Sequence, residues 1–139
     1  MTIPADDGWH FIGKHAFRFE PPDILFSRPI GDMSVDQVKQ MMAFLDTLPA
    51  PEKGFFALLD SAQAGRQDPA AMKLPEVMER MQLYQAMVYF NADFHHRTII
   101  GLYQRVGRLM KFATSNIPVM ICNTETEARA WIDAQRRKS

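Results

Sequence analysis

The stretch from Phe55 to Leu59 constrains the fold more than any other part of the sequence. Five apolar residues follow Gly54 without a break, and the run ends abruptly at Asp60 and Ser61. A strand points alternate side chains to opposite faces, so a run that is apolar at every position buries both faces. We therefore predict a central strand over Gly54–Asp60, in a sheet with other layers on both sides.

Four other segments have strand patterns. Lys14–Glu20 alternates between apolar and polar residues, and the turn Pro21-Pro22-Asp23 joins it to Ile24–Gly31. This pair predicts an antiparallel hairpin in which Pro29 ends the regular pairing. The remaining predicted strands are Ala86–Asn91 and Ile117–Asn123.

Helical patterns separate these strands. Ser34 and Gln37 form a capping-box signature at the start of the first helix, which Pro49 stops, and Thr124 with Glu127 repeats the signature at the last helix. The other predicted helices are one begun by Asp68 and Pro69, which Pro75 interrupts and whose longer piece covers Glu76–Gln85, and a long amphipathic one over Phe94–Ala113.

The order of these elements predicts an α/β fold. Strands separated by helices favour parallel pairing, while the opening hairpin adds an antiparallel pair. At 139 residues, the chain is long enough for one domain with its own core. We predict a single domain over residues 1–139, with a mixed five-stranded sheet and about four helices.

Charge and cysteine content narrow the classes of function. Sixteen basic and sixteen acidic side chains cancel, which argues against a nucleic-acid partner. The single cysteine, Cys122, lies in an apolar strand, where we expect a buried and inert thiol, and it fits a reducing compartment. No apolar stretch approaches the roughly 20 residues that span a bilayer, and the acidic N-terminus does not resemble a secretory signal. These features predict a cytoplasmic protein.

The histidine pair His95 and His96 does not predict a metal site. Adjacent residues on a helix point about 100° apart, so both rarely reach one ion. No cysteine or acidic cluster completes a ligand set. We expect no metal and no cofactor.

The polar residues after the central strand are the first candidate site. Asp60 and Ser61 fall at the carboxyl end of a strand, where open α/β sheets bind ligands, and Asp68 closes the loop that follows. The alternative is that Asp60 only bonds backbone amides of the loop. Ser61 lacks the flanking glycines and the placed histidine of a hydrolase nucleophile, so we expect a binding loop and no catalytic residue.

The long helix carries a second candidate surface. Arg97, Arg105, Arg108 and Lys111 fall within about one third of its circumference, at roughly 100° per residue. Such a cationic face would suit anionic lipid head groups or an acidic partner, and the alternative is a solvated helix face. The first helix has apolar residues beyond a single narrow stripe, at Met41, Met42 and Phe44. We expect these side chains to pack in the core, to line a cavity or to contact a second subunit.

The chain resembles the SpoIIAA-like branch of the STAS domain family. The resemblance rests on ALLD at the end of the central strand, AMVYFN before a helix that starts near His95, and ETEARAWI in the closing helix. STAS domains that act as anti-sigma factor antagonists carry a phosphorylatable serine or threonine after the central strand. In the matching stretch, QDPAAM, Asp68 takes the acidic position but Pro69 and Ala70 replace the hydroxyls, which implies that the usual phosphorylation switch is missing.

The resemblance implies a non-enzymatic regulatory or protein-interaction module. Its partner would be a regulatory protein or a second copy of the chain, bound through the exposed helices and the Asp60–Asp68 loop. The branch is also similar in fold to the Sec14 or CRAL-TRIO lipid-binding modules. That likeness implies the alternative function, a carrier or sensor of a lipophilic small molecule that associates peripherally with an anionic membrane surface.

Overall fold

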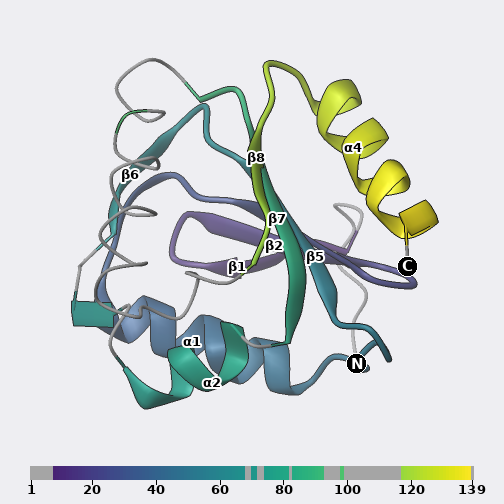
Figure 1. The fold of residues 1–139 in the computed structure, drawn as a ribbon. Helices are drawn as coiled ribbons and strands as arrows, with labels where there is room; N and C mark the ends of the chain where they lie inside the picture. The colour runs from purple at the N-terminus through teal and green to yellow at the C-terminus, as the bar shows by residue number, and fades with distance from the viewer. Residues whose placement is uncertain are drawn as a thin grey trace.

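The computed structural model describes residues 8–67, 70–71, 74–81, 83–92, 98 and 117–138. Eight strands lie in these ranges and fall into two sheets (Figure 1). They are β1 (His10–Ile12), β2 (His15–Glu20), β3 (Ile24–Arg28), β4 (Gly31–Met33), β5 (Phe55–Asp60), β6 (Ala64–Gln67), β7 (Tyr84–Phe90) and β8 (Val119–Ile121).

The main sheet is mixed and has the order β1-β2-β3-β5-β7-β8. The opening strands β1, β2 and β3 are antiparallel, and β3, β5, β7 and β8 are parallel to one another. The predicted hairpin, its end before Pro29, and the central place of β5 are therefore confirmed. The sheet has six strands and not the predicted five, because β1 adds an edge strand. β1 was missed because three residues are too few to show an alternating pattern.

Three helices lie within the described ranges: α1 (Val35–Asp46), α2 (Pro75–Met81) and α4 (Glu125–Lys138). The predicted capping box of α1 is present, since the Gln37 N–H donates to the Ser34 hydroxyl and the Ser34 N–H donates to Gln37 Oε1. α2 ends at Met81, so the predicted helix over Glu76–Gln85 was too long. Tyr84 and Gln85 belong to β7 instead, where Tyr84 is buried. The predicted helix over Phe94–Ala113 lies outside the described residues.

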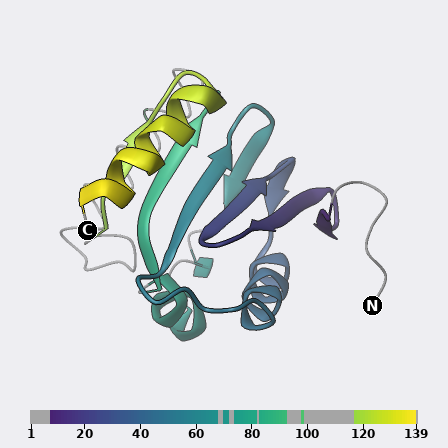
Figure 2. The same cartoon turned by 90° about the vertical axis from the view of Figure 1, so that its right-hand side faces the viewer.

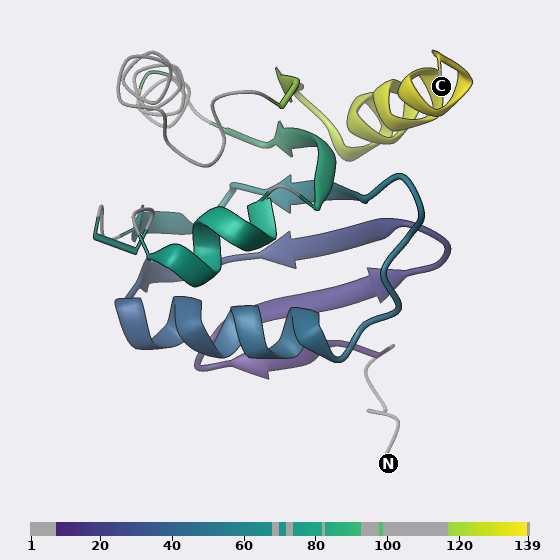
Figure 3. The ribbon, with the colours of Figure 1, turned by 60° about the horizontal axis from the view of Figure 1, so that its bottom comes forward.

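Helices cover both faces of the main sheet. Figure 2 shows α4 on one face and α1 with α2 on the other, and Figure 3 brings α1 and α2 forward. Even-numbered and odd-numbered residues of β5 feed separate cores, because strand side chains alternate. Phe55 and Ala57 pack in the core under α1 and α2, and Phe56 and Leu58 pack in the core under α4. Met41 and Met42 of α1 are buried in the first of these cores.

The segment after Asp60 is partly regular, although the sequence predicted a polar loop up to Asp68. β6 pairs with β4 in a second, two-stranded parallel sheet. Gly65 of β6 passes close to β4: a Cβ atom there would lie 2.4 Å from Asp32 Oδ1 and 2.5 Å from the Gly31 carbonyl carbon. The pairing was not predicted because strands this short, with small and polar residues, have no hydrophobic pattern.

Of the described helices, none has both the length and the apolar character required to cross a bilayer. Cys122 directly follows β8 and is half-buried, so it is more accessible than predicted.

Candidate functional site: the carboxyl edge of the parallel strands

Three polar side chains meet where β3, β5 and β7 end. Asp60 Oδ2 accepts a hydrogen bond from Arg28 Nε at 3.2 Å, and Asp60 Oδ1 accepts from Asn91 Nδ2 at 3.3 Å. The backbone N–H of Ala62 also donates to Asp60 Oδ1, at 3.1 Å. The Asp60 side chain is 14% exposed, so burial and three donors fix the carboxylate in place.

Ser61 points away from solvent. The residue is 4% exposed, its N–H donates to the Phe90 carbonyl at 2.9 Å, and its own carbonyl accepts from the Ala64 N–H at 3.3 Å. These bonds tie the end of β5 to β7 on one side and to the start of β6 on the other. Ser61 therefore shapes the loop, while its neighbours Ala62 and Gln63 are exposed.

A buried histidine holds the second sheet against α1. His15 in β2 is 1% exposed, and its Nδ1 accepts from the Ile30 N–H at 3.0 Å. The proton therefore resides on Nε2, which lies 3.1 Å from the Asp32 carbonyl oxygen and 3.3 Å from Gln37 Oε1. One neutral imidazole thus connects β2, the chain entering β4, and the first turn of α1.

The predicted site residues have different outcomes. Asp60 lies at the carboxyl edge, as expected, and it bonds a loop amide as its alternative interpretation required. A binding role for Asp60 and Ser61 stays a prediction. Asp68 lies outside the described residues, and so do all four members of the predicted cationic face, Arg97, Arg105, Arg108 and Lys111.

Sequence reasoning missed two members of this edge, Arg28 and Asn91. Arg28 directly precedes Pro29, which was predicted to end the pairing of its strand, and Asn91 ends the predicted strand Ala86–Asn91. The carboxyl ends of parallel strands meet at one edge of a sheet. That shared position was the signal that could have grouped them. Asn91 has a positive φ of 60°, a left-handed conformation that asparagine tolerates better than most residues.

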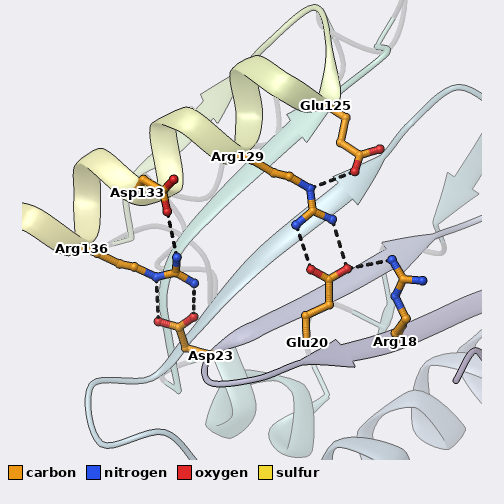
Figure 4. Close-up of polar contacts among 7 residues, drawn as sticks. All are labelled: Arg18, Glu20, Asp23, Glu125, Arg129, Asp133 and Arg136. Carbon is orange, nitrogen blue, oxygen red and sulfur yellow. Dashed lines mark hydrogen bonds and ion pairs between the residues drawn. The ribbon is translucent and has the colours of Figure 1, made fainter. Parts of the chain in front are cut away.

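Arginines of α4 fasten this helix to the hairpin between β2 and β3 (Figure 4). Arg129 makes a bidentate pair with Glu20, at 2.8 and 3.0 Å, and its Nε also bonds Glu125 at 2.8 Å. About two helical turns further along α4, Arg136 makes a bidentate pair with Asp23. The acidic first turn and basic last turn of α4 match the helix dipole. Two of the arginines, however, also bind across to the sheet.

Glu20 is the shared acceptor of this network. It bonds Arg129 with both oxygens, and Arg18 Nη2 lies 2.8 Å from its Oε2. The hydrogen bonds from Arg129 are the largest cause that lowers the pKa of Glu20 below its ordinary value of 4.5, and burial opposes them. The same contact raises the pKa of Arg129.

Arg18 and Arg28 also stack on one tryptophan. Their guanidinium carbons lie 4.4 Å and 4.8 Å from the ring centroid of Trp9, just before β1. Trp9 in turn packs edge-to-face on Phe26, with ring centroids 5.2 Å apart. The stack therefore joins β2 and β3 on the same face of the sheet as α4.

The opposite end of the parallel strands carries an open pocket of about 330 Å³. Its lining mixes charged and amide side chains with prolines and a glycine. Gln85 donates to the Gly54 carbonyl, and Arg136 and Asp23 bind each other. Within the described ranges this is a surface hollow, so the lipophilic-carrier alternative stays a prediction. The lining residues are Pro22, Asp23, Pro51, Glu52, Lys53, Gly54, Gln85 and Arg136.

Comparison with solved structures identifies the fold. The chain is similar to an uncharacterized protein of the DUF3478 family with a SpoIIAA-like fold, from Shewanella loihica PV-4. The two share 12% sequence identity over 84% of this chain and 90% of that chain, with a TM-score of 0.59. The fold is SpoIIAA-like. The chain is likewise similar to the anti-sigma factor antagonist SpoIIAA in its unphosphorylated form, with 14% identity over 86% of this chain and 97% of that chain and a TM-score of 0.52.

No family model and no curated protein sequence matches the chain. The resemblance to the SpoIIAA-like branch, first noted from short sequence motifs, is thus confirmed at the level of the fold. The further likeness to Sec14 and CRAL-TRIO modules stays a prediction.

Proposed function

We propose that this SpoIIAA-like chain is a non-enzymatic regulatory module that works by binding another protein. The SpoIIAA-like fold carries this proposal, because one of the similar structures is an anti-sigma factor antagonist, which acts on a regulatory protein. Fold alone does not fix function, so the candidate surface must supply the rest.

The carboxyl edge supports a binding surface that keeps its shape. Asp60 is held by three donors and Ser61 by two backbone hydrogen bonds, so the exposed residues between β5 and β6 are displayed on a fixed frame. The exposed side chains here, Ala62 and Gln63, are small or neutral. A preformed surface of this kind loses little conformational entropy when a partner docks.

The proposed module differs from a phosphorylation-switched antagonist. Ala70 is exposed near the position where the resemblance requires a hydroxyl, and alanine has no acceptor for a phosphoryl group. Ser61 is buried in the turn after β5. We therefore propose that binding is controlled by the partner's abundance or state, and not by phosphorylation of this chain.

The test compares two variants with the same chemical change. Ala62→Arg places a long cation on the carboxyl edge, and Ala130→Arg places one on the exposed side of α4. Immobilised wild-type protein and both variants are used to capture proteins from the cells that express the chain, with quantification by mass spectrometry. We expect a defined protein that wild type and Ala130→Arg retain and Ala62→Arg loses. If no protein is captured specifically, or if both variants retain it equally, this edge is not the binding surface.

A second copy of the chain is the other candidate partner. Light scattering after size-exclusion chromatography measures the mass of the purified protein and of the two variants. A dimer that Ala62→Arg converts to a monomer would identify the partner as the chain itself.

A further inference from the structure

The face of the main sheet that carries α4 is only partly covered by it. Among the elements described, α4 packs its buried Ala128 and Ile132 over β5 and β7, in the core with Phe56 and Val88. Toward β1 the same face becomes accessible. Phe11 there is 54% exposed, although it is a large apolar side chain.

Strand register places the accessible side chains in one group. Phe11 of β1 is paired with Ala16 of β2, and Ala16 is paired with Arg28 of β3, so these three form a row across the sheet. Arg18 is paired with Phe26 in the next row on the same face. Trp9 lies against both arginines and Phe26. We call Trp9, Phe11, Arg18 and Arg28 the arginine–aromatic patch.

The carboxylates of Glu20 and Asp60, beside this patch, are already paired with donors of the protein. Both oxygens of Glu20 bind arginines, and both oxygens of Asp60 accept hydrogen bonds. These acidic side chains are 22% and 14% exposed, whereas Arg28 is 39% exposed. Of these two carboxylates and the two arginines of the patch, the Arg28 side chain therefore reaches solvent most.

Donor groups remain on both guanidiniums. Arg28 uses its Nε for Asp60, and Arg18 uses its Nη2 for Glu20. Within the described ranges, the Nη1 and Nη2 groups of Arg28 and the Nη1 group of Arg18 have no hydrogen-bond acceptor. Stacking on Trp9 already restricts both side chains, so little further entropy is lost when an acceptor binds.

We infer that the arginine–aromatic patch is a docking surface for an acidic segment of a partner protein, one that carries carboxylates next to an apolar side chain. Carboxylates complement the free guanidinium donors, and the apolar side chain would cover Phe11. Arginine and tryptophan are enriched among the residues that dominate binding energy in protein interfaces. An extended nucleic acid or an anionic membrane fits less well, because the chain has no net charge to attract a polyanion.

This inference rests on the proposed function, since it names the chemistry of the partner and adds a second surface for it. The Arg28–Asp60 bond makes that surface continuous with the carboxyl edge. One partner could thus contact Ala62 and the patch together.

The test uses the fluorescence emission of Trp9, which is part of the patch, to report peptide binding. In a Trp131→Phe background Trp9 is the remaining tryptophan, because the chain has two. The probe is the capped peptide Glu-Glu-Leu-Glu-Glu-Leu, and its matched control replaces every Glu with Gln. We expect a saturable change of Trp9 emission with the acidic peptide, weakened by added salt, and about tenfold weaker binding of the neutral peptide.

Two variants probe the two halves of the patch, and a third variant is the control. Arg28→Gln removes the guanidinium and its charge, and Phe11→Gln removes the exposed apolar contact; each should weaken peptide binding about fivefold. Arg137→Gln, on the exposed side of α4, makes the same loss of charge and should bind as wild type. Phe11→Gln keeps the test valid if loss of the Arg28–Asp60 bond prevents folding.

Several outcomes would overturn the inference. Equal affinity for the two peptides, or equal affinity of Arg28→Gln, Phe11→Gln and Arg137→Gln, would show that the patch binds nothing acidic. Binding of phosphatidylserine vesicles that requires Arg28, without peptide binding, would make the ligand a membrane. If Asp6→Asn with Asp7→Asn alters Trp9 emission without any peptide, the chain's own acidic N-terminus occupies the patch.

The outcomes also separate this inference from the proposed function. In one outcome, Ala62→Arg loses the captured partner, Arg28→Gln retains it, and no variant binds the peptide. This outcome leaves the proposed function intact and shows that the patch is not a docking surface. Specific peptide binding by the patch, without a protein captured through the carboxyl edge, supports the patch and contradicts the edge as the primary surface.

Discussion

Arg28 and Asp60 join the ends of two neighbouring parallel strands, with Arg28 Nε 3.2 Å from Asp60 Oδ2. In the ladder between β3 and β5 the last pair is Ser27 with Leu59, so the two charged residues stand one position beyond that ladder. The carboxylate faces the carboxyl edge with Asn91, while the guanidinium reaches the stack on Trp9. This single pair therefore couples the two surfaces proposed for binding.

Asp60 is expected to stabilise the fold as well as to shape the edge. Asp60→Ala leaves three donors without their acceptor, and we expect a loss of roughly 1–3 kcal/mol in the free energy of unfolding. Urea denaturation followed by circular dichroism measures it. Asp133→Ala is the control, because that side chain is 58% exposed and its loss should cost no more than about 0.5 kcal/mol. Equal destabilisation by the two changes would contradict a structural role for the Asp60 carboxylate.

Glu20 predicts a specific loss of stability in acid. Its pKa is lowered in the folded protein, chiefly by the hydrogen bonds from Arg129, so below its ordinary value of 4.5 the unfolded chain binds more protons than the folded one. The contribution of Glu20 is fully present above that value and is lost as the pH falls through the lowered pKa. Wild-type protein should therefore lose more stability between pH 7 and pH 3 than Glu20→Gln, by thermal unfolding across that range.

The control for this prediction is Glu127→Gln on the exposed side of α4, whose carboxylate bonds Thr124 and, among the described residues, no arginine. It should keep the acid sensitivity of the wild-type protein. A Glu20→Gln variant with unchanged acid sensitivity would mean that the bidentate pair with Arg129 does not form in solution.

His15 in β2 should be far more important for stability than His10 in β1. His15→Ala leaves the Ile30 N–H without its acceptor in a part-buried place, and we expect a cost of roughly 1–3 kcal/mol. His10 is exposed and stacks on Phe44, so His10→Ala should cost about 0.5 kcal/mol.

Hydrogen exchange localises the effect of His15. In His15→Ala the Ile30 amide and the amides of β4 should exchange faster, while those of β5 and β7 keep their order of protection. Uniform acceleration across all strands would show that His15 acts on global stability and does not specifically hold β4 against α1.

Ser61 should stay unmodified in the folded protein. Its residue is 4% exposed and two backbone hydrogen bonds fix the turn that contains it, so a kinase has no access to the hydroxyl. Incubation with ATP and an extract of the expressing cells, followed by intact-mass and peptide mass spectrometry, is expected to find no phosphate at Ser61. A phosphate mapped to Ser61 in folded protein would require the turn after β5 to open and would overturn this account of the loop.

Local sequence determined the elements whose side-chain pattern is long enough to read. Five consecutive apolar residues placed β5 at the centre of the sheet, and Ser34 with Gln37 fixed the start of α1, because burial on both faces and helix capping are properties of neighbouring residues. The same reasoning placed Asp60 at the carboxyl edge. It did not find β1 or the β4–β6 sheet, since strands of three and four residues carry too little pattern.

The tertiary structure decided which distant side chains meet. Arg129 and Arg136 of α4 bind Glu20 and Asp23, which lie 109 and 113 residues away in the sequence, and no local pattern indicates these partners. Likewise, only the sheet register brings Trp9 against Arg18 and Arg28. Periodicity and capping depend on the few residues next to each position. Ion pairs, stacking and accessible patches depend on how separated segments are packed, and that arrangement exists only after the chain has folded.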